Sequence, residues 1–266
     1  MDKYFSGEVL YGDDFSKEQI SQWYEDEKEG YADLVAGYKK EYHYGYRHLD
    51  ELYGYKYLPK RRYGNVLGIG SAYGDEFRPI ATQIDHLYIL EPSDHLVTDH
   101  IDGMNPVYKK PNIDGTIDFP DGFFDLIVCF ATLHHIPNVT HVMNEFYRCL
   151  RPGGFLLLKE PINSMGDWRE ARSGLTKRER GIPYGYFKKM IADLGFKVIR
   201  ESPHFTMTSF LVRKTGKLLQ KSIYEYKAYL FIDKYLSRLF RWNITYHPVT
   251  KLKRIAPSKI FYVLSK

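Results

Sequence analysis

Short apolar runs that alternate with helix-like stretches constrain the fold of this chain most strongly. Six such runs stand apart along the sequence, at 65–69, 86–90, 125–130, 154–159, 196–201 and 260–264. The segment 138–150 carries apolar side chains at helical spacing and ends at an Arg-Pro-Gly-Gly sequence. Strands that are apolar on both faces and alternate with helices are typical of an α/β fold, with a parallel sheet covered by helices.

The length and the composition indicate one large folded domain, or one domain with a cap. The chain has 266 residues, of which 44% are hydrophobic and 27% charged, so it can bury a core. We expect an N-terminal helical cap at 1–60 and the sheet domain at 61–266, with a helical insertion at about 203–258 before the last strand. Apolar residues at helical spacing predict one long helix over about 216–240.

The cysteines, the N-terminus and the histidines bear on compartment and metal content. The two cysteines, Cys129 and Cys149, form no zinc-binding motif and fit a reducing environment. The first ten residues lack the apolar core of a signal peptide, and the apolar stretch 126–133 is too short to span a bilayer. The ten histidines are scattered along the chain. We therefore expect a cytoplasmic protein without a metal.

The charge is distributed unevenly along the chain. Residues 1–60 carry 13 acidic and 8 basic side chains, whereas residues 213–254 carry 11 basic side chains and only Glu225 and Asp233 as acids. A basic segment of this kind is usually a solvated surface. It can also form a face for phosphates, nucleic acid or anionic lipid, so peripheral membrane contact is an open alternative.

A glycine-rich turn follows the first apolar run, in the sequence VLGIGSAYGDE at 66–76. Gly68, Gly70 and Gly74 allow a tight turn and a close approach of a ligand to the backbone. The helix that is expected to follow adds oriented N–H groups. Glu91 closes the next run, where its carboxylate can accept both hydroxyls of a ribose. Dinucleotide-binding enzymes share these features, so they indicate a nucleotide-like ligand without identifying it.

Two further segments indicate which class of nucleotide-binding enzyme this chain resembles. The sequences DGTIDFPDGFFDLIVCFATLHHIPN at 114–138 and LRPGGFLLLKEP at 150–161 resemble the class I S-adenosylmethionine-dependent methyltransferases, most closely the branch that acts on small molecules. The resemblance covers about residues 64–161. It implies a Rossmann-like, seven-stranded, mostly parallel sheet whose last strand is antiparallel. It also implies S-adenosylmethionine as cofactor and S-adenosylhomocysteine as product.

The resemblance assigns the glycine-rich turn to the methionine part of the cofactor. Gly68, Gly70 and Ser71 would form this turn. The family usually has an acidic residue where this chain has Gly68, and often a glycine where it has Ala72. The missing carboxylate normally orients the amino-acid end of the cofactor. The departure at Gly68 therefore also allows a degenerate, non-catalytic binding or scaffold protein.

The resemblance places four other residues around the nucleoside and the sulfonium. Glu91 would hold the ribose, while Asp114 and Gly115 would lie near the adenine, with Asp114 accepting from its exocyclic amine. Phe130 would border the sulfonium pocket.

Methyl transfer to a hydroxyl needs an aligned acceptor and benefits from a general base. His134 and His135 follow the run at 125–130, at the edge where α/β folds bind ligands. His135 is the better candidate for the acceptor side, and in the other interpretation both histidines only shape the pocket. Glu160 reaches the same edge, either as a catalytic group or as a buried hydrogen-bonding carboxylate.

Weaker features of the sequence bear on the identity of the methyl acceptor. Residues 160–183 and 251–266 look similar to methyltransferases of bacterial surface-polysaccharide clusters, which would imply a nucleotide-linked or lipid-linked sugar. Trp168 could then stack on a sugar. A set of basic residues could clamp a diphosphate, namely Lys177, Arg178 and Arg180. Packing of the tryptophan and solvation of the charges are the alternatives.

Two other enzyme classes fit parts of the sequence. The basic C-terminal region suggests an RNA methyltransferase, but the chain has no Asp/Asn-Pro-Pro-Tyr/Phe motif, no Pro-Cys nucleophile and no appended RNA-binding module. The glycine-rich turn and Glu91 would also suit a nicotinamide-dependent oxidoreductase, against which the 114–138 and 150–161 segments argue. A methyltransferase acting on a small-molecule or glycan acceptor is therefore the leading hypothesis.

Overall fold

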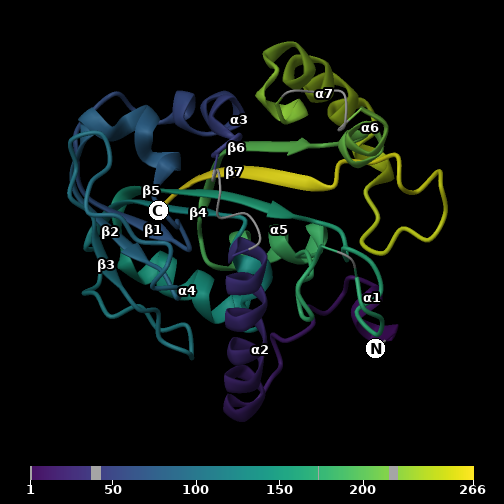
Figure 1. Ribbon diagram of the computed structural model, residues 1–266, viewed down its shortest axis with the longest axis horizontal. Helices are drawn as coiled ribbons and strands as arrows, with labels where there is room; N and C mark the ends of the chain where they lie inside the picture. The colour runs from purple at the N-terminus through teal and green to yellow at the C-terminus, as the bar shows by residue number, and fades with distance from the viewer. Residues whose placement is uncertain (1, 37–42, 173, 216–220) are drawn as a thin grey trace.

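The computed structural model describes residues 2–36, 43–172, 174–215 and 221–266. Its centre is a seven-stranded sheet with the order β3-β2-β1-β4-β5-β7-β6 (Figure 1). The strands, in chain order, are Tyr63–Ile69 (β1), Ile84–Leu90 (β2), Val107–Lys109 (β3), Phe124–Phe130 (β4), Leu150–Pro161 (β5), Lys197–His204 (β6) and Lys259–Ser265 (β7). The neighbours from β3 to β5 run parallel, and β7 lies antiparallel between β5 and β6. The predicted mostly parallel sheet with an antiparallel last strand is confirmed.

Helices cover both faces of the sheet. The helices and 3-10 turns are Asp2–Phe5 (α1), Lys17–Ala36 (α2), Arg47–Tyr53 (α3), Tyr55–Tyr57 (η1), Asp75–Gln83 (η2), Leu133–His135 (η3), Val139–Cys149 (α4), Tyr184–Asp193 (α5), Thr208–Thr215 (α6), Ile223–Glu225 (η4), Lys227–Leu239 (α7) and Arg241–Asn243 (η5). Figure 1 shows α4 and α5 on one side of the sheet, and α3 and α7 on the other.

Both faces of the sheet are buried, which explains why the strands are continuous apolar runs. In β4, Ile127 and Cys129 belong to the core under α4 and α5, whereas Leu126 and Val128 belong to the core under α3 and α7. All four side chains are fully buried. Because successive side chains of a strand point to opposite faces, a strand covered on both sides needs apolar residues at every position.

The single long helix predicted over 216–240 is wrong. The structure ends α6 at Thr215 and begins α7 at Lys227, while residues 216–220 lie outside the described part of the chain. Between them, Ser222 and Glu225 form a capping box that starts the separate turn η4. The division into a cap, a sheet domain and an insertion stays a prediction. Among the helices that the structure describes, none has the length and apolar content needed to cross a bilayer.

Candidate active site

The glycine-rich turn is built at the C-terminal edge of β1. Gly70 has a φ of +59°, and its N–H donates to the carbonyl of Leu90 at 2.8 Å. A Cβ at position 70 would lie 2.7 Å from the side chain of Thr132. The backbones leaving β1 and β4 therefore approach so closely that only glycine fits between them.

A mainly apolar pocket opens beside this turn, between the ends of β1, β2 and β4. Its floor includes Gly70, Glu91 and Thr132, and helix α2 contributes Tyr24 and Glu27 to its wall. The remaining lining residues are Ile69, Leu90, Pro92, Ser93, Pro111, Asn112, Ile113, Gly115, Thr116, Ile117, Ala131, His135, Ile136, Pro137, Val142 and Phe146. The sequence pattern did not predict Tyr24 and Glu27 as site residues, because their contact with the edge of the sheet depends on how α2 packs.

Glu91 lies in this pocket with its carboxylate held by the backbone. Its Oε2 accepts from the N–H of Ala72 and its Oε1 from the N–H of Ser93, each at 3.0 Å. Burial raises the pKa of this carboxyl, and the two amide bonds act in the opposite direction. Each carboxylate oxygen can accept a second hydrogen bond, so Glu91 keeps acceptor capacity for a ligand hydroxyl.

Asp114 is exposed, and its side chain forms a hydrogen bond within its own turn. Its carboxylate accepts from the N–H of Thr116 at 2.9 Å, and this bond lowers the pKa of the carboxyl. Its carbonyl accepts from the amide of Asn138 at 2.7 Å. Gly115 and Thr116 line the pocket directly, whereas Asp114 is not among the lining residues.

The space beside Gly68 is already filled. A Cβ at this position would lie 2.4 Å from the Ser71 hydroxyl and 2.9 Å from the Phe77 ring, so an acidic side chain there would need both to move. The Ser71 hydroxyl is buried without a hydrogen-bond partner. Nearby, Glu76 is buried at the start of η2. Glu76 was not predicted as a site residue, although it is the last residue of the glycine-rich motif.

Burial raises the pKa of Glu76 to about 7, against smaller opposite effects of the Ser71 hydroxyl and the Lys159 ammonium. Lys159 itself is paired with the buried Asp50 at 2.7 Å. The ammonium of Lys159 lies 4.4 Å from the centre of the Phe130 ring, which also packs on Phe261. Phe130 thus faces the core under α3, while Ala131, the next residue, lines the pocket.

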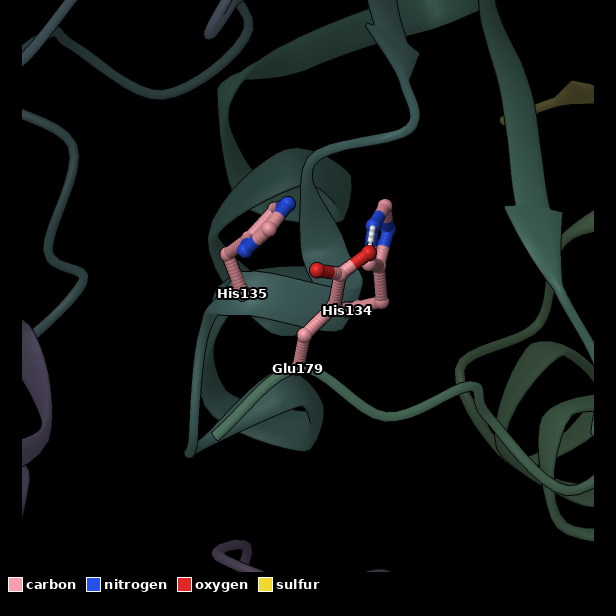
Figure 2. Close-up of side chains that lie close together, drawn as sticks. All are labelled: His134, His135 and Glu179. Atoms are coloured by element: carbon pink, nitrogen blue, oxygen red, sulfur yellow. Dashed lines mark ion pairs between the residues drawn. The ribbon is translucent and has the colours of Figure 1, made fainter. Parts of the chain in front are cut away.

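The two histidines follow β4 in the short turn η3 and differ in environment. His134 is buried, with Nδ1 at 2.7 Å from Glu160 and Nε2 at 3.3 Å from Glu179. Figure 2 shows this second pair and the neighbouring ring of His135. His135 lines the pocket, and its Nδ1 lies 2.7 Å from Glu27 of α2.

The carboxylates decide the charge of His134. Burial alone lowers the pKa of His134, but Glu160 and Glu179 outweigh it and raise that pKa above its usual value. Burial would raise the pKa of Glu179, yet the hydrogen bond from His134 lowers it to about 2. One ligand atom each of His134, His135 and Glu179 lies within 4.8 Å of the others, a spacing compatible with a metal ion. Because both ring nitrogens of His134 already contact carboxylates, the arrangement suits an imidazolium better than a metal ligand.

The residues predicted to bind the acceptor lie outside the pocket lining. Trp168 is buried against Tyr11 and Phe5, with ring centres 5.2 and 4.4 Å away. Lys177 and Arg178 pair with Asp26 of α2. These side chains hold the N-terminal segments against the segment that follows β5.

Arg180 does not have the free N–H donors that the predicted diphosphate clamp requires. It is fully buried, and its three nitrogens make five hydrogen bonds at 2.8–3.3 Å to backbone carbonyls. The acceptors are the carbonyls of Tyr11, Leu133, His134, Ile136 and Pro137. A guanidinium has five N–H donors, so none remains for a phosphate.

The sequence profile described as a methyltransferase domain matches residues 41–201. The chain belongs to this methyltransferase family. A curated relative, the 27-O-demethylrifamycin SV methyltransferase of Amycolatopsis mediterranei, is 28% identical over 131 residues, which are 43% of this chain and 47% of that protein. The chain thus spans less than half the length of this relative.

Solved structures share the fold at low identity. An S-adenosylmethionine-dependent methyltransferase from Mesorhizobium loti has a TM-score of 0.50 and 13% identity, covering 79% of this chain and 94% of its own. The [4+2]-cyclase SpnF has a TM-score of 0.54 and 14% identity, covering 94% and 96%. The methyltransferase domain of this chain therefore has a fold that is shared with a methyltransferase dependent on S-adenosylmethionine as cofactor.

The described residues fit this cofactor. Gly70 lines the pocket without a side chain, so a ligand can approach the backbone there, and Glu91 presents a buried carboxylate. The unpartnered Ser71 hydroxyl lies beside the same turn. The pocket therefore combines apolar walls with a few polar groups, as small-molecule cofactor sites do.

We expect His134→Gln to change how stability depends on pH. Because the pKa of His134 is raised in the folded state, its contribution is fully present below about pH 6.5 and is lost as the pH rises through the folded pKa. At pH 6 the substitution should lower the free energy of unfolding by about 3 kcal/mol, because it leaves buried carboxylates unpaired. Denaturant unfolding of both proteins from pH 6 to 9 measures this. Parallel pH profiles would contradict the assignment of a charged His134.

Proposed function

We propose that this methyltransferase transfers the methyl group to a hydroxyl of a small-molecule or glycan acceptor, with His135 as the general base. The observation that carries the proposal is that His135 lines the pocket while Glu27 contacts its Nδ1 at 2.7 Å. A carboxylate on Nδ1 fixes the orientation of an imidazole and leaves the opposite ring nitrogen to face a substrate. The name of the curated relative, which acts on 27-O-demethylrifamycin SV, also supports an oxygen acceptor.

The residues around His135 hold it in place. Its carbonyl accepts from the indole N–H of Trp23 at 2.7 Å. Glu27 in turn accepts from the hydroxyl of Thr176 at 2.6 Å and from the N–H of Arg178 at 2.8 Å. Helix α2 therefore supports the proposed base as well as the pocket wall, consistent with a cap formed by residues 1–60.

When bound, S-adenosylmethionine supplies a methyl group on a positively charged sulfur. Nε2 of His135 would take the proton of the acceptor hydroxyl, because Nδ1 is engaged with Glu27. Glu91 would hold the ribose hydroxyls, and the backbone around Gly70 would support the amino-acid end. Asp114 and Gly115 would border the adenine. These placements keep the acceptor oxygen in line with the methyl carbon, which supplies much of the catalysis.

We further propose that Glu76 provides the carboxylate that the family usually places at position 68. A Cβ at Gly68 would meet Ser71 and Phe77, whereas Glu76 is buried beside that hydroxyl on the adjoining η2. A cation stabilises the ionised form of a buried carboxylate, and the cofactor ammonium is one. This proposal explains how the chain binds the cofactor without an acid at position 68.

The Glu91→Ala variant should bind S-adenosylhomocysteine more weakly by about 1–3 kcal/mol, because charge-assisted hydrogen bonds to the ribose are lost. Isothermal titration calorimetry measures the change. Asp94→Ala, an exposed acid on the following loop, is the matched control and should bind as the wild type does. Unchanged affinity of Glu91→Ala would remove the ribose assignment.

The Glu76→Gln variant should bind S-adenosylhomocysteine about tenfold more weakly, the effect of roughly 1.4 kcal/mol from a lost charge interaction. Methylthioadenosine, which lacks the ammonium, should bind both proteins equally. Because the pKa of Glu76 is about 7 and the ammonium favours the ionised acid, wild-type affinity should rise between pH 6 and 8. Equal losses for both ligands would show a structural effect instead.

The His135→Ala variant should lose about 10²- to 10³-fold in kcat with cofactor affinity within twofold, since a base is removed and the cofactor contacts are kept. The acceptor for this assay comes from a screen of S-adenosylhomocysteine release with phenols, macrolides and nucleotide sugars. His86→Ala, on the exposed side of β2, is the control. Full activity of His135→Ala on a hydroxyl acceptor would overturn the assignment of the base.

A further inference from the structure

Helix α7 has its polar side turned inward. Its buried residues are Leu230, Asp233 and Ser237. The Asp233 carboxylate accepts from the N–H groups of Phe205 and Thr206 at 2.7 and 3.0 Å, just beyond the end of β6. The hydroxyl of Ser237 lies 2.8 Å from that of Thr206. The helix is therefore anchored both by these hydrogen bonds and by Leu230, which belongs to the core under α3 and α7.

The outward side of α7 is apolar. Phe231, Tyr235 and Leu239 follow one another at four-residue spacing and are 60%, 55% and 63% exposed. Trp242, three residues beyond Leu239 in the turn η5, is 75% exposed. The rings of Phe231 and Tyr235 touch, with their centres 4.9 Å apart. Figure 1 shows α7 at the periphery of the molecule, near β6. The exposure of Phe231, Tyr235 and Leu239 places the stripe on the outer surface.

Exposed large hydrophobic residues are concentrated in this region. Ten of the fifteen in the described chain lie between Phe210 and Leu252. A soluble surface rarely groups apolar side chains without a binding role. The stripe on α7 is thus an unusual feature of this molecule rather than scattered exposure.

The sequence around the stripe is mainly basic, and one of its cations, Arg241, is paired with Glu201 of β6. From Tyr226 to Arg254 the sequence contains seven basic side chains and one acid, Asp233, which is buried under α7. Lys227 and Arg238 are exposed on α7 itself. A second copy of the chain would bring these cations against their own kind in a symmetric contact, which is unfavourable. An anionic surface complements them.

We propose that the α7 surface, defined by the apolar stripe of Phe231, Tyr235, Leu239 and Trp242 with the flanking Lys227 and Arg238, docks on an anionic lipid membrane. Apolar side chains that enter the interfacial region, bordered by basic residues that meet lipid headgroups, are the features of helices that lie on a bilayer. The aromatic rings of the stripe also suit the headgroup level.

The tryptophans allow a direct test. Trp23 and Trp168 are buried, whereas Trp242 is exposed, so a lipid-induced blue shift of the emission reports on Trp242. Vesicles of phosphatidylglycerol should shift the emission and sediment the protein, and vesicles of phosphatidylcholine should do neither. Absence of a shift with anionic vesicles at low salt, or equal binding to both lipids, would overturn the proposal. A salt-resistant dimer that buries Trp242 would do so as well.

Variants separate the two contributions. Lys227→Gln combined with Arg238→Gln should weaken partitioning into anionic vesicles about thirtyfold, and Leu239→Ser should reduce it further while the fold is kept, because its side chain is exposed. The matched controls are Lys188→Gln with Lys189→Gln on α5, and Val97→Ser, which is also an exposed apolar residue. Equal losses in the controls would show that binding depends on overall charge or surface hydrophobicity. That result would contradict a defined α7 surface.

Discussion

A carboxylate buried at the end of β5 organises the loop on which the active site depends. Glu160 accepts hydrogen bonds from the N–H groups of Thr132 and Leu133, at 2.9 and 2.8 Å, and contacts the ring of His134. Leaving one of these buried groups unpaired would cost about 1–3 kcal/mol, so the loop after β4 has one favourable path. That path places Thr132 against the glycine-rich turn and brings His135 to the pocket.

The same loop joins the sheet to the N-terminal helices. Arg180 donates hydrogen bonds to carbonyls of this loop and to the carbonyl of Tyr11. Trp23 and Glu27 of α2 contact His135. The pocket is consequently built from the strand edge and from α2 together. A sheet common to many enzymes, including the [4+2]-cyclase SpnF, acquires its particular site from these connections.

The sequence predicted the centre of the sheet well because β4, most of β5 and β7 are buried on both faces and contain continuous apolar runs. It missed β3, whose three residues are not buried and carry no such signal. It also missed Glu27, which reaches His135 across 108 positions of the chain, and Glu76, whose burial depends on how η2 packs. Arg180 appeared to be a charge for a ligand because sequence alone does not show the carbonyls that occupy its donors.

Cofactor binding by the wild-type protein is the most direct test of this account. Calorimetric titration with S-adenosylmethionine, S-adenosylhomocysteine and NAD should give micromolar dissociation constants for the two sulfur compounds and no heat with NAD. This result would agree with a pocket that holds the nucleoside at Glu91 and the ammonium at Glu76. A folded sample that binds neither sulfur compound would contradict the account and would favour a binding or scaffold protein on this fold.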